Sequence, residues 1–218
     1  MSTTTTKGSD TRERILDAAQ ALILARGFAG TSLDDILKAT KLTKGAFFHH
    51  FRSKADLGSV LVHRFAERDM AAFEEWSRRA DALADDPLQA AMVFLKLFEE
   101  ELKGLPEPFP GCMLASYVYE REQFDADVLE YVAEVFRKWS NYFEARFEQV
   151  MKTRKPKVAV SARELAEMIV SILEGAFILS RAYNEPKLIV RQSELFRQHL
   201  QLLFAENASP QSSPKLPA

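Results

Sequence analysis

The sequence predicts an all-α fold, with a three-helix N-terminal helix-turn-helix domain followed by a larger C-terminal helical bundle. Glycine and proline are scarce, with 8 and 9 copies in 218 residues, and long stretches without either favour helices over turn-rich β structure. Apolar residues recur at helical spacing, and Ser, Thr or Asp precedes several of these stretches. No segment has the pattern of a strand, so we expect helices throughout.

The composition indicates a soluble globular protein, with 47% hydrophobic and 28% charged residues. The Thr-rich start lacks the apolar segment of a secretory signal, and no apolar run approaches the roughly 20 residues of a membrane span. A single cysteine, Cys112, excludes an intrachain disulfide. We therefore expect a cytoplasmic protein without membrane contact.

The helix-turn-helix domain is expected in residues 10–56, and each of its helices has capping signals. Asp10 and Glu13 have the spacing of a capping box for a first helix over 10–26, which Gly27 ends. Thr31 or Ser32 can cap a second short helix. A third helix is expected from Lys44 to about His50, with Thr43 as its cap.

The larger domain is expected in residues 57–204, with disordered tails at 1–9 and 205–218. Ser53 and Asp56 have the spacing of a capping box, and so do Ser161 and Glu164. The later helices are expected at about 53–80, 88–103, 112–122, 125–152, 161–183 and 187–204.

The third helix has an inner and an outer face. Its apolar anchors for a small core are Leu42, Ala46, Phe47 and Phe51. Its outer face is expected to expose Thr43, Lys44, Gly45, Phe48 and His49. A helix start also presents free N–H groups and positive dipole to a phosphate. This arrangement is typical of a recognition helix that enters the major groove of DNA.

The charge distribution agrees with this interpretation. Residues 1–56 contain nine Lys or Arg and six Asp or Glu, whereas the rest of the chain contains 20 and 25. A basic N-terminal part followed by an acidic remainder is typical of a protein that binds phosphate groups with its N-terminal part.

Three segments together resemble the DNA-binding domain of the tetracycline-repressor (TetR) family. They are T-R-E-R-I-L-D-A-A from Thr11, R-G-F-A-G-T-S-L-D-D-I from Arg26, and L-T-K-G-A-F-F-H-H-F-R-S-K-A-D-L from Leu42 to Leu57. The rest of the chain resembles that family's C-terminal ligand and dimer domain in helix count and length. The resemblance implies a ligand-responsive transcriptional regulator, and it favours a repressor over an activator.

The resemblance also implies roles for individual residues. Thr43, Lys44 and His49 match positions that contact DNA, and Thr31, Ser32 and Lys54 match positions that hold phosphates. The family usually has Tyr where this chain has Phe48, and phenylalanine cannot donate a hydrogen bond to phosphate.

A pocket for a small apolar or aromatic effector is expected in the acidic body, where many aromatic residues accompany a few ionisable groups. The candidate lining residues are Phe98, Tyr117, Tyr119, Glu120, Trp139, Phe143, Glu174, Phe177 and Arg181. Aromatic residues at helical spacing also suit an ordinary core.

Cys112 follows a Pro/Gly segment and opens a helix, whose dipole would lower the thiol pKa. This suggests a thiol-sensing regulator of the same fold as an alternative function, while a structural role for a buried cysteine is the simpler interpretation.

The last two helices are expected to form a homodimer interface, which would require a palindromic operator. The apolar residues that suggest this are Leu165, Met168, Ile169, Ile172, Ala176, Leu179, Leu195, Phe196, Leu200 and Leu203.

Two other classes of function were considered. An enzyme is not supported, because the chain has no P-loop, no G-x-G-x-x-G, no H-E-x-x-H and no E-x-x-H pairs. The four histidines are not spaced as a metal set, so neither a metal nor a cofactor is expected. A helical adaptor that binds only protein would not explain the polar and basic groups on one short helix.

Overall fold

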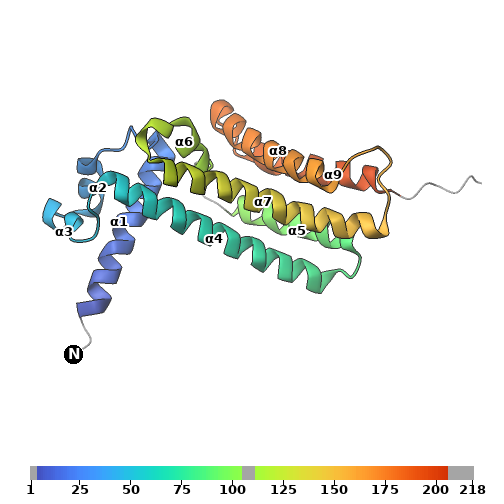
Figure 1. Cartoon of the computed structure of the whole chain (residues 1–218), viewed down its shortest axis with the longest axis horizontal. Helices are drawn as coiled ribbons and strands as arrows, with labels where there is room; N and C mark the ends of the chain where they lie inside the picture. The colour runs from blue at the N-terminus through green and yellow to red at the C-terminus, as the bar shows by residue number, and fades with distance from the viewer. Residues whose placement is uncertain (1–3, 105–110, 206–218) are drawn as a thin grey trace, which may run out of the picture.

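The computed structural model describes residues 4–104 and 111–205, and within them every regular element is helical (Figure 1). This confirms the predicted all-α fold. The α-helices are α1 (Thr4–Arg26), α2 (Leu33–Thr40), α3 (Lys44–Phe48), α4 (Lys54–Leu83), α5 (Pro87–Lys103), α6 (Met113–Tyr119), α7 (Ala126–Thr153), α8 (Ala162–Tyr183) and α9 (Lys187–Leu203), and a short 3₁₀ turn, η1, covers Arg121–Gln123. None of the helices in the described ranges is long and apolar enough to cross a membrane.

α1 begins at Thr4, six residues before its predicted start. Asp10 therefore lies inside the helix and does not cap it, and the helix includes residues 4–9, which were expected in a disordered tail. Once a helix has nucleated, each added residue gains a hydrogen bond, so the chain can extend past an internal Asp. Glu13 does not cap the helix, and its carboxylate instead forms an ion pair with Arg64 of α4, at 3.4 Å.

The caps of the next helices follow the sequence prediction closely. Ser32, and not Thr31, caps α2, and its side chain and that of Asp35 form a complete capping box. Thr43 caps α3 by accepting a hydrogen bond from Ala46 N at 3.2 Å. Ser53 caps α4, although Asp56 bonds to Arg52 N and so completes only half of the predicted box.

α4 is one continuous helix of 30 residues that belongs to both parts of the molecule. Near its start, Leu57 and Leu61 are buried in the same core as the small N-terminal helices, and further along Phe73 and Trp76 are buried in the body. In Figure 1 it leads from the α1–α3 end along the length of the body. A displacement of α4 would therefore move both parts.

The body is a bundle in which α4, α5 and α7 pack together and α8 and α9 cover α7 and α5 (Figure 1). The predicted helix over 112–122 is shorter than expected, because it ends at Tyr119 and continues as η1. Asn184 ends α8 in the left-handed conformation, with φ of 53°. Of the tails predicted to be disordered, residues 1–3 and 206–218 lie outside the described residues.

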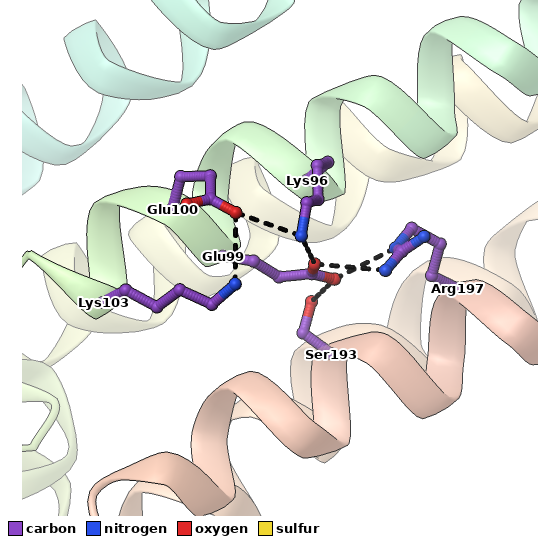
Figure 2. A network of polar contacts seen from close by, with 6 residues as sticks. All are labelled: Lys96, Glu99, Glu100, Lys103, Ser193 and Arg197. Carbon is purple, nitrogen blue, oxygen red and sulfur yellow. Dashed lines mark hydrogen bonds and ion pairs between the residues drawn. The ribbon is translucent and has the colours of Figure 1, made fainter.

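A buried ion pair ties α5 to α9 (Figure 2). The Glu99 side chain is 0% exposed. It accepts hydrogen bonds from Ser193 Oγ at 3.2 Å and from Arg197 Nε at 3.1 Å. Lys96 lies 3.6 Å from the same carboxylate. The partners meet the requirement that a buried charge be neutralised and hydrogen-bonded, so the contact fixes the register of α9 on the bundle.

Candidate functional site

The outer face of α3 is open to solvent. Thr43, Lys44, Gly45 and His49 are exposed, and Phe48 is 51% exposed. The fold keeps this face outward because Phe47 and its neighbours anchor the other side: Phe47 and Phe51 are buried, and Leu42 packs against the same core. Nothing lies within 3.4 Å of a side chain added at Gly45, so the backbone there is accessible.

Among the residues that the structure describes, the ionic neighbour of Lys44 is the Asp34 carboxylate, at 3.5 Å. Both side chains are more than half exposed, and an exposed pair of this kind is worth at most about 1 kcal/mol. The Lys44 ammonium is therefore free to exchange Asp34 for a phosphate or a base edge.

The three residues predicted to hold phosphates have different environments. Ser32 is exposed at the start of α2. Thr31 is 0% exposed and its hydroxyl donates to Gly27 O at 2.9 Å, so its side chain faces the interior rather than an approaching phosphate. Lys54 donates from Nζ to Phe28 O and to Thr31 O, both at 2.7 Å, and therefore stabilises the α1–α2 loop.

Three residues predicted to line the effector pocket instead join the body to the N-terminal helices. Glu120 accepts hydrogen bonds from the backbone N–H groups of Phe28, at 2.9 Å, and Ala29, at 2.5 Å. Arg181 of α8 donates to the carbonyls of Leu24, at 2.9 Å, and Ala25, at 2.6 Å. A guanidinium at that place neutralises the negative end of the α1 dipole.

The third of these residues, Tyr117, is buried and donates its hydroxyl to Gly58 O on α4, at 2.8 Å. Burial raises the pKa of Tyr117, so the hydroxyl stays protonated and keeps donating. Gly58 also lets the Phe28 ring pack closely on α4, because a Cβ there would lie 2.7 Å from that ring. Tyr119, another candidate, is 72% exposed. The prediction of these four residues as pocket lining is not supported.

A cavity of about 480 Å³ lies in the body, at the meeting point of α1, α4, α5, α7 and α8. Five predicted effector residues line it: Phe98, Trp139, Phe143, Glu174 and Phe177. α4 contributes more lining residues than any other helix, among them Phe65, Asp69, Phe73 and Trp76. Cavities of this size, in which aromatic and other apolar side chains are combined with polar groups, are typical of small-molecule sites.

Sequence reasoning missed several polar residues of this cavity, among them Asp69 and Gln20. A signal for Asp69 was available, because it lies four residues after Phe65 and four before Phe73, on the apolar side of α4. Burial raises the pKa of Asp69 to about 6. Gln20 lies on the side of α1 that carries Leu16 and Ile23, at the same helical spacing.

Models of two protein families match the chain. The model described as bacterial regulatory proteins of the tetR family matches residues 15–58. The model of the C-terminal domain of LmrA/YxaF-like transcriptional regulators matches residues 87–194. Together they cover well over half of the chain.

The chain belongs to the TetR family. It is a transcriptional regulator and not an enzyme, and members of this family bind DNA operators.

Curated relatives of this TetR-family protein are transcriptional regulators. The transcriptional repressor DhaR of Mycobacterium sp. (strain GP1) is 22% identical over 197 residues, which cover 88% of this chain and 90% of DhaR. LmrA of Bacillus subtilis (strain 168) is 26% identical over 182 residues, 78% of this chain and 86% of LmrA. The repressor NemR of Escherichia coli (strain K12) is 41% identical, but only over 30% of this chain and 31% of NemR.

Solved structures of TetR-family regulators share the fold. A regulator from Agrobacterium tumefaciens aligns with a TM-score of 0.76 at 22% identity, covering 88% of this chain and 98% of that one. One from Chloroflexus aurantiacus J-10-FL aligns with a TM-score of 0.74 at 26% identity, covering 89% and 96%.

The thiol pKa of Cys112 in this TetR-family chain is shifted in the opposite direction from the one predicted. Burial raises the thiol pKa well above its ordinary value, and the nearby Glu174 carboxylate raises it further. The prediction of a dipole-lowered pKa is therefore wrong, because desolvation and a neighbouring carboxylate outweigh the helix start. A protonated thiol is a poor nucleophile, so the geometry disfavours thiol sensing.

The outer sides of α8 and α9 carry exposed apolar side chains. These are Met168, Ile178, Leu179, Tyr183, Leu195 and Leu202. Several residues predicted for a dimer interface are instead buried within the chain: Leu165, Ile169, Ala176, Phe196, Leu200 and Leu203. A Cβ added at Gly175 would meet nothing within 4 Å, so another backbone could approach α8 there.

Proposed function

We propose that this TetR-family regulator is a homodimer that uses α3 of each subunit to bind a palindromic operator. We also propose that a small apolar or aromatic effector, bound in the α4 cavity, releases the protein from the operator. The observation that carries the DNA-binding part is the exposed face of α3, where Thr43, Lys44 and His49 surround a capped helix start. DhaR and NemR are named as repressors, which supports repression as the outcome.

The role of α3 is tested by selecting binding sites from random duplex DNA. Wild-type protein is expected to enrich a palindrome with two identical half-sites. Lys44→Ala is expected to relax the selected sequence at one position per half-site if Lys44 contacts a base. If Lys44 contacts only phosphate, the sequence is unchanged and the affinity falls for all sequences alike. Unchanged sequence and affinity in both Lys44→Ala and His49→Ala would contradict the proposal.

The homodimer is proposed to form through the exposed apolar residues of α8 and α9. Contiguous exposed apolar surface on a soluble protein commonly marks an interaction surface. Two helices from each subunit would make a four-helix bundle with two-fold symmetry. Light scattering at micromolar concentration tests this, and a monomeric mass would contradict it.

Release by an effector is proposed to act through α4, which lines the cavity and also begins inside the N-terminal core. A ligand can shift DNA binding only by binding two conformations with different affinity. A preference of 100-fold per dimer for the DNA-incompetent conformation would weaken operator binding by up to about 2.7 kcal/mol.

Trp139→Ala tests the location of the effector site. The compounds used are members of an aromatic library that lower operator affinity of the wild type. The variant is expected to lose this response while its operator affinity without ligand stays within about twofold. If the response is unchanged and only the melting temperature falls, Trp139 is a core residue and the effector binds elsewhere.

A further inference from the structure

Three polar atoms that line the α4 cavity are buried and have no hydrogen-bond partner outside the cavity wall. They are Oδ2 of Asp69, Oε1 of Gln20 and Nε1 of Trp139. No other carboxylate, amide or indole atom in residues 9–104 and 111–205 is in this condition. Buried polar groups in native proteins nearly always have partners. The Trp139 indole N–H acts as a hydrogen-bond donor toward the Asp69 carboxylate and opposes the rise of its pKa, whereas Gln20 Oε1 has no such donor. Acceptor oxygens of two residues that remain available on one cavity therefore indicate a bound molecule with hydrogen-bond donors.

A second carboxylate, that of Glu174 on α8, lines the same cavity. The pKa of Glu174 is raised to about 7, mainly by burial; the hydrogen bond with the Cys112 thiol lowers it and the nearby charge of Asp69 raises it. Neither carboxylate has an ion pair within the described ranges. The cavity thus holds two acids without the positive charge that would stabilise their ionised forms.

The basic groups of the lining do not supply this charge. Arg68 is directed to α1, where it lies 3.6 Å from Glu13 and 3.9 Å from Asp17. The charged lining residues in the described part of the chain are Arg68 and Arg79 against Asp69, Glu75, Glu101 and Glu174. The acids outnumber the bases by four to two, so the cavity favours a cation.

The remaining wall is aromatic. Two tryptophans and five phenylalanines line the cavity: Phe65, Phe73, Trp76, Phe98, Trp139, Phe143 and Phe177. The faces of such rings attract a cation by about 0.5–2 kcal/mol each, most strongly where water is excluded, and they also bury an apolar body.

We propose that the effector is a protonated amine with an aromatic or apolar body, whose ammonium group donates hydrogen bonds to Asp69 on α4 and Gln20 on α1. This proposal rests on the effector cavity proposed above and names the chemical class of its ligand. It also identifies a direct link between ligand and DNA-binding domain, because Gln20 belongs to α1. A metal ion is not the expected cation, since no group of three His, Cys, Asp or Glu in the described ranges could hold one.

Three ligands that share one aromatic ring system and differ only in their polar group test the proposal without relying on a protein variant. The probes are 2-naphthylmethylamine, 2-naphthalenemethanol and 2-naphthoate, titrated into the full-length protein by calorimetry at pH 8.0 and pH 5.5. At pH 8.0 the ammonium is expected to bind at least 30-fold more tightly than the alcohol, and the carboxylate more weakly than either. At pH 5.5 this advantage is expected to shrink at least fivefold, because both cavity acids become protonated while the amine stays charged.

The variants Asp69→Asn and Asp85→Asn distinguish the loss of a ligand contact in the cavity from the loss of one negative charge elsewhere on the protein. Both variants remove one negative charge, and Asp85 is exposed beyond the end of α4 and does not line this cavity. Asp69→Asn is expected to weaken amine binding at pH 8.0 at least tenfold and to leave alcohol binding within twofold. Asp85→Asn is expected to change neither. If Asp69→Asn does not fold, Glu174→Gln serves as the second variant, with at least a threefold loss of amine binding.

The outcomes distinguish this proposal from the one on which it rests. If the alcohol or the carboxylate binds as tightly as the amine and lowers operator affinity, the cavity is an effector site but its ligand is not a cation. If the amine binds with the expected preference but operator affinity is unchanged, the cation site stands and the effector role fails. If none of the three probes binds, the cation proposal is overturned.

Discussion

Glu120 connects the body to the N-terminal helices, and its removal is expected to loosen that connection. Its carboxylate accepts two backbone hydrogen bonds, from Phe28 and Ala29. A hydrogen bond to a charged group contributes about 1.5–3 kcal/mol. One of the two bonds is exposed and the other is partly buried, so we take the lower end and expect a total loss of about 2 kcal/mol in Glu120→Ala.

The assay is amide hydrogen exchange of a peptide that covers residues 24–33, together with urea unfolding. A loss of about 2 kcal/mol in local stability corresponds to roughly 30-fold faster exchange in the α1–α2 loop. Glu122→Ala is the matched control, because Glu122 is exposed two residues further along and carries the same charge. If exchange and stability in Glu120→Ala stay within experimental error of Glu122→Ala, the junction does not depend on this carboxylate.

Four further predictions concern other parts of the molecule. Glu99→Gln is expected to lower the free energy of unfolding in urea by about 2–3 kcal/mol, and Glu100→Gln by less than about 0.5 kcal/mol, because only Glu99 is buried with its partners. Phe48→Tyr is expected to raise operator affinity by about 1 kcal/mol in fluorescence anisotropy if its new hydroxyl reaches a phosphate. Burial raises the pKa of Asp69 to about 6, so its protonated form favours folding below pH 4 and this contribution is lost as the pH rises through 6. Unfolding free energy is therefore expected to fall between about pH 4 and pH 7, and less so in Asp69→Asn. Leu195→Glu is expected to give a monomer by light scattering, whereas an unchanged dimer would contradict an interface on α9.

The helices and the α3 surface could be predicted because their causes are local. Ser32, Thr43 and Ser161 act within three residues of themselves, and the capping signals that they form are visible in the sequence. The outer and inner faces of α3 follow from helical spacing alone. The start of α1 was predicted wrongly because Asp10 has a capping pattern that the continuing helix does not use.

The cavity and the junction could be predicted only in part, because long-range packing decides them. Arg181 bonds to carbonyls 156 and 157 residues away, and Glu120 bonds to N–H groups 91 and 92 residues away. Composition identifies such residues as ionisable groups among aromatics, but not as contacts of the cavity or the junction. Asp69 was missed because a single acid in a long helix is usually solvated.

The central claim is that α3 carries the DNA-binding surface, and Lys44 tests it most directly. The measurement is the affinity of the selected operator for wild type, Lys44→Ala and Lys152→Ala by fluorescence anisotropy, at several salt concentrations. Lys152 is an exposed lysine in the last turn of α7, at the opposite end of the molecule from α3, and its loss changes the net charge equally (Figure 1). We predict that Lys44→Ala weakens binding by about 1–3 kcal/mol, or lowers the salt slope by about one if Lys44 meets only phosphate. Lys152→Ala is expected to behave as wild type. Equal affinities and equal salt slopes for all three proteins would contradict the account.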